Sequence, residues 1–291
     1  MAVDVEELRR WVGRRQVVDD VIAAEPIARL KATLDGAGPP PKPGDALPPL
    51  WHWLYFLDAA PADELGADGH RRHGAFLPPL PLPRRMWAGS RLSFPRPLRV
   101  GERARRQSRL QNIAVKQGRS GELVFVTVHH TITGPDGPAI EEDQELVFRD
   151  APKPDEAPAR PTQAPEGPWR RQIEPDPVML FRYSALTFNG HRIHYDRTYA
   201  TEVAGYPGLV VHGPLIATLM LELVRHEAPG AVIKRFAFRA RRPIFDTGPF
   251  TVGGAPGEDG GKCHVWAIDN AGWLAADGEV ELAGRGRSRG S

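Results

Sequence analysis

The sequence predicts an α+β fold in which an antiparallel sheet wraps around a helix, and it predicts that this arrangement occurs twice. Three observations support the prediction: one convincing apolar helix followed by four strands, a strand hairpin in the first half, and short sequences that recur in both halves. A chain of 291 residues is long enough for one large domain or two modest ones.

The helix lies in the second half. Apolar residues recur at helical spacing from Leu215 to Val224, Pro214 suits the first turn, and a Pro-Gly pair at 229–230 ends the element. Four β-type segments follow, and their connections are too short for helical crossovers. They cover 233–240, 250–252, 262–268 and 273–282. A long helix followed by four antiparallel strands is the hot-dog architecture.

The first half contains a hairpin and two sequences that recur later. Segments 122–133 and 141–149 are rich in β-branched residues and flank the turn Gly-Pro-Asp-Gly. The motif Arg-Arg-Gln-Val at 14–17 recurs as Arg-Arg-Gln-Ile at 170–173, and Arg-Pro-Leu at 96–98 recurs as Arg-Pro-Ile at 242–244. Their shared order favours a duplicated fold with one eroded copy over chance matches.

The two copies are separated by a segment rich in proline, alanine and charge. Such a composition predicts an extended, solvated linker. We therefore divide the chain into a degenerate N-terminal hot-dog at 1–150, a proline-rich linker at 151–168 and a catalytic C-terminal hot-dog at 169–291.

Composition excludes several classes of protein. A net charge of +2, from 38 basic and 36 acidic residues, provides no global field for nucleic acid. The single cysteine, Cys263, excludes a disulfide framework and a cysteine-based zinc cluster. The first residues lack the apolar core of a signal peptide, and the most apolar helix is too short to span a bilayer. We expect a cytoplasmic protein with no membrane contact.

The segment from Phe181 to Asp196 is the richest in candidate functional residues. It places Asn189, His191 and His194 beside tyrosines in a stretch without a clean period. Titratable residues in an irregular segment next to an apolar helix are typical of a site. A solvated loop whose histidines decorate turns is the alternative interpretation.

This segment resembles the signature of the hydratase-2 or MaoC-like dehydratases, in which Gly-Asp-x-Asn-Pro-Leu-His carries the catalytic Asp and His. Asn189 stands where that Asp falls, and His194 stands where that His falls. The sequence Val-His-Gly-Pro-Leu at 211–215 is similar to the family's His-Gly turn into its central helix. The amino-acid sequence of residues 186–196 most resembles the branch of mesaconyl-CoA hydratases and type 2 hydroxyacyl-thioester dehydratases. The resemblance is strong over 170–285, weak before it, and implies a double hot-dog fold.

The resemblance also implies an activity, namely reversible addition of water to an enoyl thioester. The expected substrate is an acyl-CoA, such as mesaconyl-CoA or a similar short branched dicarboxylyl-CoA. No cofactor is expected beyond the CoA thioester itself, and a homodimer is the expected self-association. The alternatives are a 3-hydroxyacyl-ACP dehydratase of fatty acid synthesis, a hot-dog thioesterase, and a non-catalytic acyl-CoA-binding subunit.

Three residues are assigned catalytic roles. An Asn carboxamide cannot act as a base near neutral pH, so Asn189 would orient water or the histidine. Proton transfer then falls to His194, whose ordinary pKa near 6.5 suits both directions. The N–H of Gly213, at the start of the helix, would stabilise negative charge on the thioester oxygen. The alternative for Gly213 is a simple helix entry.

Further residues are expected around the substrate. Tyr206 could shape the acyl pocket or form a turn, while Arg239 and Arg241 could bind phosphate, a substrate carboxylate or an acidic carrier, or form a solvated strand face. The full expected substrate-binding set is His191, Tyr183, His212, Tyr206, Arg239 and Arg241.

Other histidines and the first half are expected to be structural. His191 and His194 have metal-like spacing but no obvious third ligand, so no metal is expected. His129 and His130 should point to opposite faces of one strand, and the stretch 70–73 should be surface decoration. With Asp35 aligned to Asn189 and no matching histidine after it, the first half should be a scaffold.

Overall fold

The structure is a computed structural model, and it describes residues 4–36, 38–72, 74–118, 121–150 and 160–283. In the first half the helical elements are α1 (Val5–Arg9), α2 (Ala24–Thr33) and the short 3-10 turns η1 (Trp51–Leu54) and η2 (Ala62–Glu64). Its strands are β1 (Arg15–Val21), β2 (Arg84–Ser93), β3 (Arg103–Gly118), β4 (Gly121–Gly134) and β5 (Gly137–Arg149).

The second half likewise has one strand, a helix and two short turns before its four remaining strands, and it adds a long helix, α4. Its helical elements are α3 (Pro177–Leu186), η3 (Arg192–His194), the π-helical turn η4 (Tyr199–Val203) and α4 (Gly213–Glu227). Its strands are β6 (Trp169–Ile173), β7 (Ile233–Ala240), β8 (Phe250–Pro256), β9 (Lys262–Ile268) and β10 (Leu274–Leu282). The predicted hairpin and all four strands predicted after the central helix are present.

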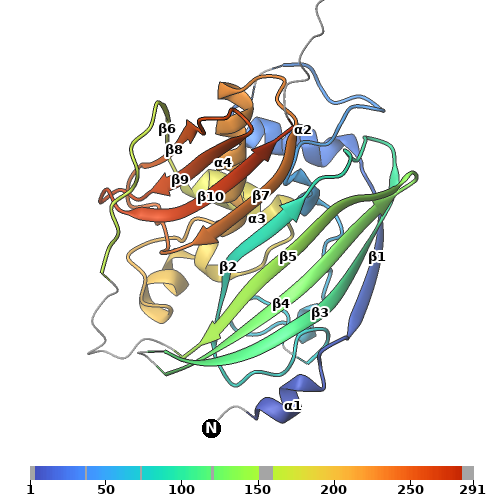
Figure 1. The fold of residues 1–291 in the computed structure, drawn as a ribbon. Helices are drawn as coiled ribbons and strands as arrows, with labels where there is room; N and C mark the ends of the chain where they lie inside the picture. The colour runs from blue at the N-terminus through green and yellow to red at the C-terminus, as the bar shows by residue number, and fades with distance from the viewer. Residues whose placement is uncertain (1–3, 37, 73, 119–120, 151–159, 284–291) are drawn as a thin grey trace, which may run out of the picture.

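All ten strands form one sheet, with α2, α3 and α4 on the same face (Figure 1). The order is β1-β3-β4-β5-β2-β7-β10-β9-β8-β6, so each half repeats the other with every strand number raised by five. Antiparallel pairing of β2 with β7, from Gly89↔Arg239 to Ser93↔Arg235, joins the halves. The predicted duplication and the double hot-dog arrangement are therefore present in the topology.

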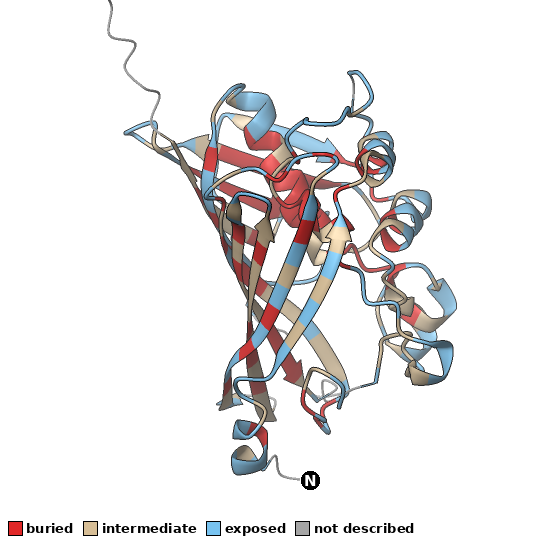
Figure 2. Ribbon diagram, turned by 90° about the vertical axis from the view of Figure 1, so that its right-hand side faces the viewer, coloured by how far each residue is buried: buried red, intermediate tan, exposed pale blue. Residues whose placement is uncertain are grey.

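Helix α4 is the centre of the second half. Nine of its residues are buried, from Leu215 to Val224, and it packs against β8, β9 and β6. Figure 2 shows the buried residues gathered between the sheet and the helices on its face. Such a helix is buried nearly all round, because the sheet curves around it. No helix in the described ranges has the length and apolar content needed to cross a membrane.

The first half lacks a matching long helix within its described residues. A short backbone bridge, Ala46↔Arg99, lies where Val210↔Phe245 lies in the second half. After Val210 the chain enters α4, whereas after Ala46 come two prolines and the single turn η1. The expectation of a central helix in both halves is thus met only in the second, and the eroded copy retains one 3-10 turn in that place.

A buried carboxylate ties η1 to the sheet instead. Glu142 on β5 is 3% exposed and accepts hydrogen bonds from Trp53 Nε1 (3.1 Å), His52 Nε2 (3.3 Å) and Ser90 Oγ (2.7 Å). Burial alone would raise the pKa of Glu142, but these donors and nearby imidazoles lower it to about 2. A buried carboxylate charge must be compensated by several hydrogen-bond donors. Because two of these donors, His52 and Trp53, belong to η1, their bonds to Glu142 fix the position of η1.

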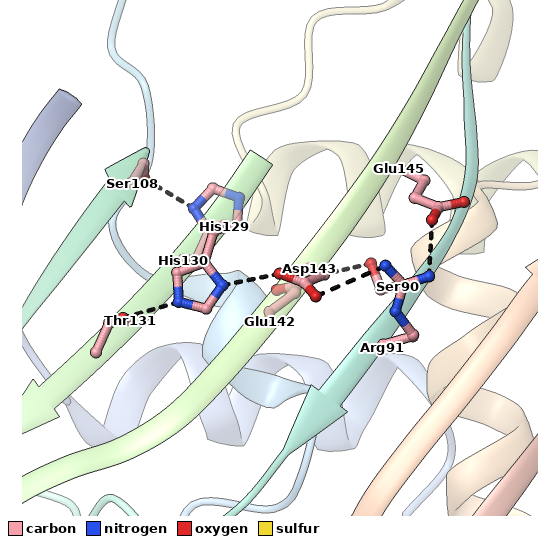
Figure 3. A network of polar contacts seen from close by, with 9 residues as sticks. All are labelled: Ser90, Arg91, Ser108, His129, His130, Thr131, Glu142, Asp143 and Glu145. Carbon is pink, nitrogen blue, oxygen red and sulfur yellow. Dashed lines mark hydrogen bonds and ion pairs between the residues drawn. The ribbon is translucent and has the colours of Figure 1, made fainter. Parts of the chain in front are cut away.

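The neighbouring histidines on β4 point to opposite faces of the strand, as predicted. His129 bonds Asp143 through Nδ1 (2.8 Å), while His130 bonds Ser108 through Nδ1 (2.7 Å) from the opposite face of β4 (Figure 3). Burial lowers the pKa of His130 to about 4, so this imidazole is neutral near pH 7.

The proposed linker lies only partly within the described chain. Residues 151–159 fall outside the described residues. Residues 160–168 are exposed apart from the half-buried Ala164, as expected of a solvated segment. They are also tethered to the second half, because Leu274 N donates to Thr162 O (2.9 Å) and Gln163 forms a bridge with Trp273.

Candidate active site

The segment expected to be irregular begins as a helix. Asp176 caps α3 by accepting from the N–H groups of Val178 and Met179, and Pro177 takes the first helical position. The helix therefore runs through to Leu186 before the left-handed residue Phe188 (φ 49°) turns the chain. The sequence alignment also shifts by one: Asp35 (φ 54°) follows α2 as Phe188 follows α3, so Asp35 corresponds to Phe188 rather than to Asn189.

His194 is a buried base with one free nitrogen. Its Nδ1 lies 2.7 Å from the carbonyl oxygen of Val210, which can only accept, so Nδ1 carries the proton. The lone pair is then on Nε2, and His194 lines a large cavity. Burial lowers the pKa of His194 to about 4, with the charge of His70 contributing, although the Val210 hydrogen bond opposes this shift. The imidazole is unprotonated near neutral pH.

The ring of His212 packs against the ring of His194. The two rings stack with centroids 3.8 Å apart and an interplanar angle of 18°. His212 is fully buried, and its Nε2 is hydrogen bonded to Ser184 Oγ (2.8 Å). It does not line the cavity, so the expectation of direct substrate contact by His212 is wrong. The geometry makes it a support that fixes the plane of His194.

Asn189 holds the loop as well as lining the cavity. Its Oδ1 accepts from the backbone N–H of His191 (3.0 Å), and its own N–H donates to the carbonyl of Ser184 (2.8 Å). The amide oxygen is thus engaged by the protein, and the side-chain NH₂ is the part of Asn189 left to meet water or substrate.

Gly213 begins α4 and lines the same cavity as His194. A Cβ at this position would meet Trp87 at 3.6 Å, an ordinary contact, so packing does not demand glycine here. Pro214 has no N–H, which leaves the Gly213 N–H as the first donor of a fifteen-residue helix. This arrangement can receive a developing negative charge.

A loop of the first half docks on this segment. Gly69, with φ +87°, lies so close to Gly190 that a Cβ on Gly69 would be 1.9 Å from the Gly190 carbonyl oxygen. Arg192 N donates to Asp68 O (2.9 Å), and the Arg192 guanidinium donates to Ala67 O (3.1 Å). Only residues without a Cβ permit this approach.

The docked loop brings a carboxylate and a third imidazole into the site. His70 Nδ1 lies 2.9 Å from Asp68 Oδ2, and the His70 and His191 ring centroids are 4.0 Å apart. The expectation of surface decoration is therefore wrong for His70, while His73 lies outside the described residues. The first half thus contributes residues to the lining of the cavity. Asp68 and His70 flank a glycine, a common turn composition, so no local pattern marked them as functional.

The pKa values of Asp68 and His191 in this cluster lie far below their ordinary values. Burial opposes ionisation of Asp68, but its hydrogen bonds to His70 hold the pKa of this carboxyl well below its usual range. Burial, with the charges of His70 and His194, lowers the pKa of His191 to about 2. His191 is therefore neutral in the working range of pH.

The same cluster has the spacing of a metal site. Ligand atoms of Asp68, His70 and His191 all lie within 4.8 Å of one another, so the third ligand that the sequence did not reveal comes from the first half. The donor set of two imidazoles and a carboxylate suits several divalent ions. The Asp68–His70 hydrogen bond already satisfies two of these groups, and the side chain of Arg85 lies close enough to disfavour added positive charge.

A cavity of about 1730 Å³ spans both halves. Of the expected substrate-binding residues, those that line it are Tyr183, His191, Tyr206, Arg239 and Arg241. Arg241 is engaged by Asp277, and Tyr206 receives a long hydrogen bond from Arg84 (3.5 Å). Tyr183 is 2% exposed and packs on His212 (4.9 Å), which makes it mainly a wall of the cavity.

Sequence reasoning missed Arg85, one of several arginines that line the cavity. Arg85 lies on β2, and within the described chain its guanidinium has no hydrogen-bond or ion-pair partner. Burial lowers the pKa of Arg85, although Asp68 and Asp58 oppose this shift. An arginine without a partner in a cavity is available to bind an anion.

The fold and this site define the class of protein. Residues 50–246 match the family model of hydroxyacyl-thioester dehydratase type 2, and the chain belongs to that family. It is 47% identical over 277 residues to mesaconyl-C(4)-CoA hydratase of Chloroflexus aurantiacus, covering 94% of this chain and 97% of the relative. It is 32% identical to the mitochondrial hydroxyacyl-thioester dehydratase type 2 of Schizosaccharomyces pombe, covering 83% and 90%.

The fold has a solved counterpart of low identity. A Mycobacterium tuberculosis protein with a double hotdog fold superposes with a TM-score of 0.58 at 12% identity, covering 93% of this chain and 96% of that one. The predicted resemblance and the predicted fold class are confirmed.

Proposed function

We propose that this protein catalyses the reversible addition of water to the α,β double bond of an acyl-CoA thioester. The observation that carries the proposal is the state of His194. Its Nδ1 is fixed on Val210, so an unprotonated Nε2 remains in a cavity that also contains the first N–H of α4. A base and a charge-stabilising donor are the two groups that hydration of an enoyl thioester requires.

His194, Gly213, His212 and Asn189 each have a separate role in this reaction. His194 Nε2 accepts a proton from water as the water oxygen bonds to the β-carbon. Negative charge then moves onto the thioester oxygen, where the Gly213 N–H at the positive end of α4 stabilises it. A proton is then added to the α-carbon and His194 releases its own proton, so that the net change is addition of one water molecule. His212 keeps the plane of His194, and Asn189 presents its NH₂ to the water. In the reverse direction His194 returns the proton to the departing hydroxyl.

The substrate proposed is a short branched dicarboxylyl-CoA such as mesaconyl-CoA. Two observations support it: the relative that is 47% identical is named as a mesaconyl-C(4)-CoA hydratase, and the unpartnered Arg85 offers a receptor for a free carboxylate inside the cavity. Arg239, which lines the cavity without an ion-pair partner among the described residues, suits an anionic part of the CoA moiety. We also propose a homodimer, which light scattering on the purified protein tests.

The activity is tested by following loss of enoyl absorbance with mesaconyl-CoA, crotonyl-CoA and a crotonyl-ACP thioester. We expect reversible hydration of the CoA thioesters, and a roughly 10²-fold or larger loss of kcat in His194→Ala, the loss typical of a general base. His264→Ala, which removes an exposed imidazole on β9, is the control and should keep wild-type activity.

Three results would contradict this function. Turnover only on the ACP thioester would indicate a carrier-bound dehydratase. Release of free thiol without loss of the double bond would indicate a thioesterase. Hydration by His194→Ala within about threefold of wild type would remove His194 from the role of base.

A further inference from the structure

We propose that Trp53 and Trp87 form a wall of the acyl pocket that restricts the substrate to short acyl groups, and that the buried Glu142 holds this wall in place. The inference rests on the proposed hydratase function and adds to it the length of the acyl chain. The two tryptophans determine specificity, and Glu142, on β5 of the first half, is a positioning residue.

Trp87 lies beside the group that receives the thioester oxygen. A Cβ built on Gly213 would meet Trp87 Cε3 at 3.6 Å, so the indole ring is within van der Waals reach of the first turn of α4. Both residues line the cavity that contains His194. An acyl group whose carbonyl oxygen accepts from the Gly213 N–H therefore has the Trp87 ring as its immediate neighbour.

Trp53 extends the same wall from η1. The ring centroids of Trp53 and Trp87 are 4.8 Å apart, and the rings meet edge to face at 80°. Phe238 on β7 also packs edge to face on Trp87, with centroids 5.2 Å apart. All three rings line the cavity. Because aromatic rings packed in this way shift little, they present a fixed apolar surface to an acyl chain.

A β-bulge sets the direction of the Trp87 side chain. The register between β2 and β5 shifts between Trp87 and Gly89, so Ala88 is the extra residue. Bulges re-aim neighbouring side chains and are frequent next to active sites. The Trp87 Nε1–H donates to Gly89 O (2.8 Å) and to Ser90 Oγ (3.1 Å), just beyond the bulge. These two bonds fix the ring in its position against α4.

One buried carboxylate connects the two tryptophans. Glu142 Oε2 accepts from Trp53 Nε1 (3.1 Å). Glu142 Oε1 accepts from Ser90 Oγ (2.7 Å; Figure 3), and the same hydroxyl oxygen accepts from Trp87. Glu142 and Ser90 are 3% and 2% exposed, and loss of a partner from so buried a charge is strongly destabilising. The nitrogen of each indole is thus engaged by the protein, and the ring carbons remain to meet an acyl chain.

This arrangement limits the length of the acyl chain. A chain that extends from Gly213 toward β5 meets first Trp87 and then Trp53, because these contacts run in series. A well-packed apolar pocket discriminates by roughly tenfold or more for a methylene that does not fit. Arg85 lies two residues before Trp87 on β2, so the proposed carboxylate receptor is on the same face of the strand as the wall. Short acyl groups that end in a carboxylate suit such a pocket.

The test compares crotonyl-CoA with octenoyl-CoA, a longer unbranched enoyl thioester, through the ratio of kcat/KM for the long substrate to kcat/KM for the short one. Both values come from one sample, so the ratio does not depend on the fraction of folded enzyme. We expect a ratio of about one tenth or less in wild type, and a rise of roughly tenfold or more in Trp53→Leu and Trp87→Leu. Trp53→Phe and Ser90→Ala keep an aromatic ring at each position but break the connection to Glu142, and each should raise the ratio roughly threefold.

Trp51→Phe is the matched control. Trp51 lies in the same turn η1 and also donates its Nε1–H to a carboxylate, that of Glu222 (2.9 Å). In the part of the chain that the structure describes, Trp51 does not line the cavity, so the ratio in Trp51→Phe should equal that of wild type.

Several outcomes would overturn the inference while leaving the hydratase function intact. A wild-type ratio near one, or a ratio in Trp87→Leu and Trp53→Leu equal to that of wild type, would remove the tryptophans from chain-length selection. Unchanged ratios in both Trp53→Phe and Ser90→Ala would remove Glu142 from the positioning role. If a leucine variant fails to fold by circular dichroism, the less disruptive Trp53→Phe provides the comparison. Absence of hydration of any CoA thioester by wild type would instead refute the proposed function.

Discussion

Single residues in this site are distinguished by which of their atoms remain available after the protein has made its own hydrogen bonds. His194 retains Nε2, Asn189 retains its NH₂, and Arg85 retains its whole guanidinium. Arg241, which is equally basic, is engaged by Asp277. Residue types and spacing pointed to the first two, which both line the cavity, but the availability of a side chain depends on partners that a linear sequence does not reveal.

Arg85 provides a test of substrate specificity. Replacement by Met removes the positive charge but retains much of the apolar stem, so Arg85→Met should raise KM for mesaconyl-CoA roughly 10- to 100-fold, the cost of one lost charge-assisted contact. Crotonyl-CoA lacks the carboxylate, and its kcat/KM should stay within about threefold. Arg91→Met, on the same strand but paired with Glu145, is the control. Equal loss for both substrates would exclude Arg85 as the carboxylate receptor.

Burial of His194 predicts a pH dependence of stability. The pKa of about 4 in the folded protein lies below the ordinary 6.5, so the unfolded chain takes up the proton first as the pH falls. Stability is therefore full above pH 6.5 and decreases toward pH 4, by about 1 kcal/mol for this one imidazole at pH 5.5. Urea unfolding at pH 7.5 and 5.5 should show a difference that shrinks by about that amount in His194→Gln.

The control for this measurement is His264→Gln, since His264 is largely exposed and should leave the difference between the two pH values unchanged. An unchanged difference in His194→Gln would mean that this imidazole is protonated as readily in the folded as in the unfolded protein.

At the scale of elements, the site depends on the loop of residues 64–72 and its partner segment 189–194. Helix α4 and its following strands were predictable because an apolar stripe and β-branched runs are local properties of the sequence. The helical start of the segment was missed, since α3 is apolar on several sides and its capping Asp176 lies outside the motif. The docking of the loop has no local signal other than two glycines, and glycines are common in this chain.

Those two glycines give a test of the docking. Gly69→Ala places a Cβ 1.9 Å from the Gly190 carbonyl oxygen and adds left-handed strain, and Gly190→Ala places one 2.8 Å from the Gly69 carbonyl oxygen. Both should displace the loop and lower hydratase kcat at least tenfold while circular dichroism stays native. Gly44→Ala has a matched φ of +86° with nothing within 4 Å, and so reports the strain alone. Equal activity of Gly44→Ala and Gly69→Ala would argue against a role for docking in catalysis.

At the scale of the whole molecule, duplication explains why half of the site was predictable. The second copy retained the helix, the His-Gly entry and the motif, and these matched a known family pattern. In place of the long helix the first copy has Pro48, Pro49 and the turn η1, and it carries the buried Glu142 anchor and the Asp68–His70 loop. Their approach to the site arises from pairing of β2 with β7, a long-range contact that local sequence patterns do not contain.

This junction predicts that the two halves unfold together. Gly89 lies where β2 meets β7, and a Cβ there would be 2.2 Å from the Phe238 carbonyl oxygen. Gly89→Ala should therefore destabilise the protein by roughly 3 kcal/mol or more and lower the midpoint of one cooperative urea transition, with activity lost at the same denaturant concentration. Gly134→Ala, whose Cβ would meet only side-chain ends, should cost far less. The contradicting result would be two separate urea transitions, with activity lost only when the second half unfolds. It would show that the two halves unfold independently although their strands are paired. The active site would then not depend on the first half.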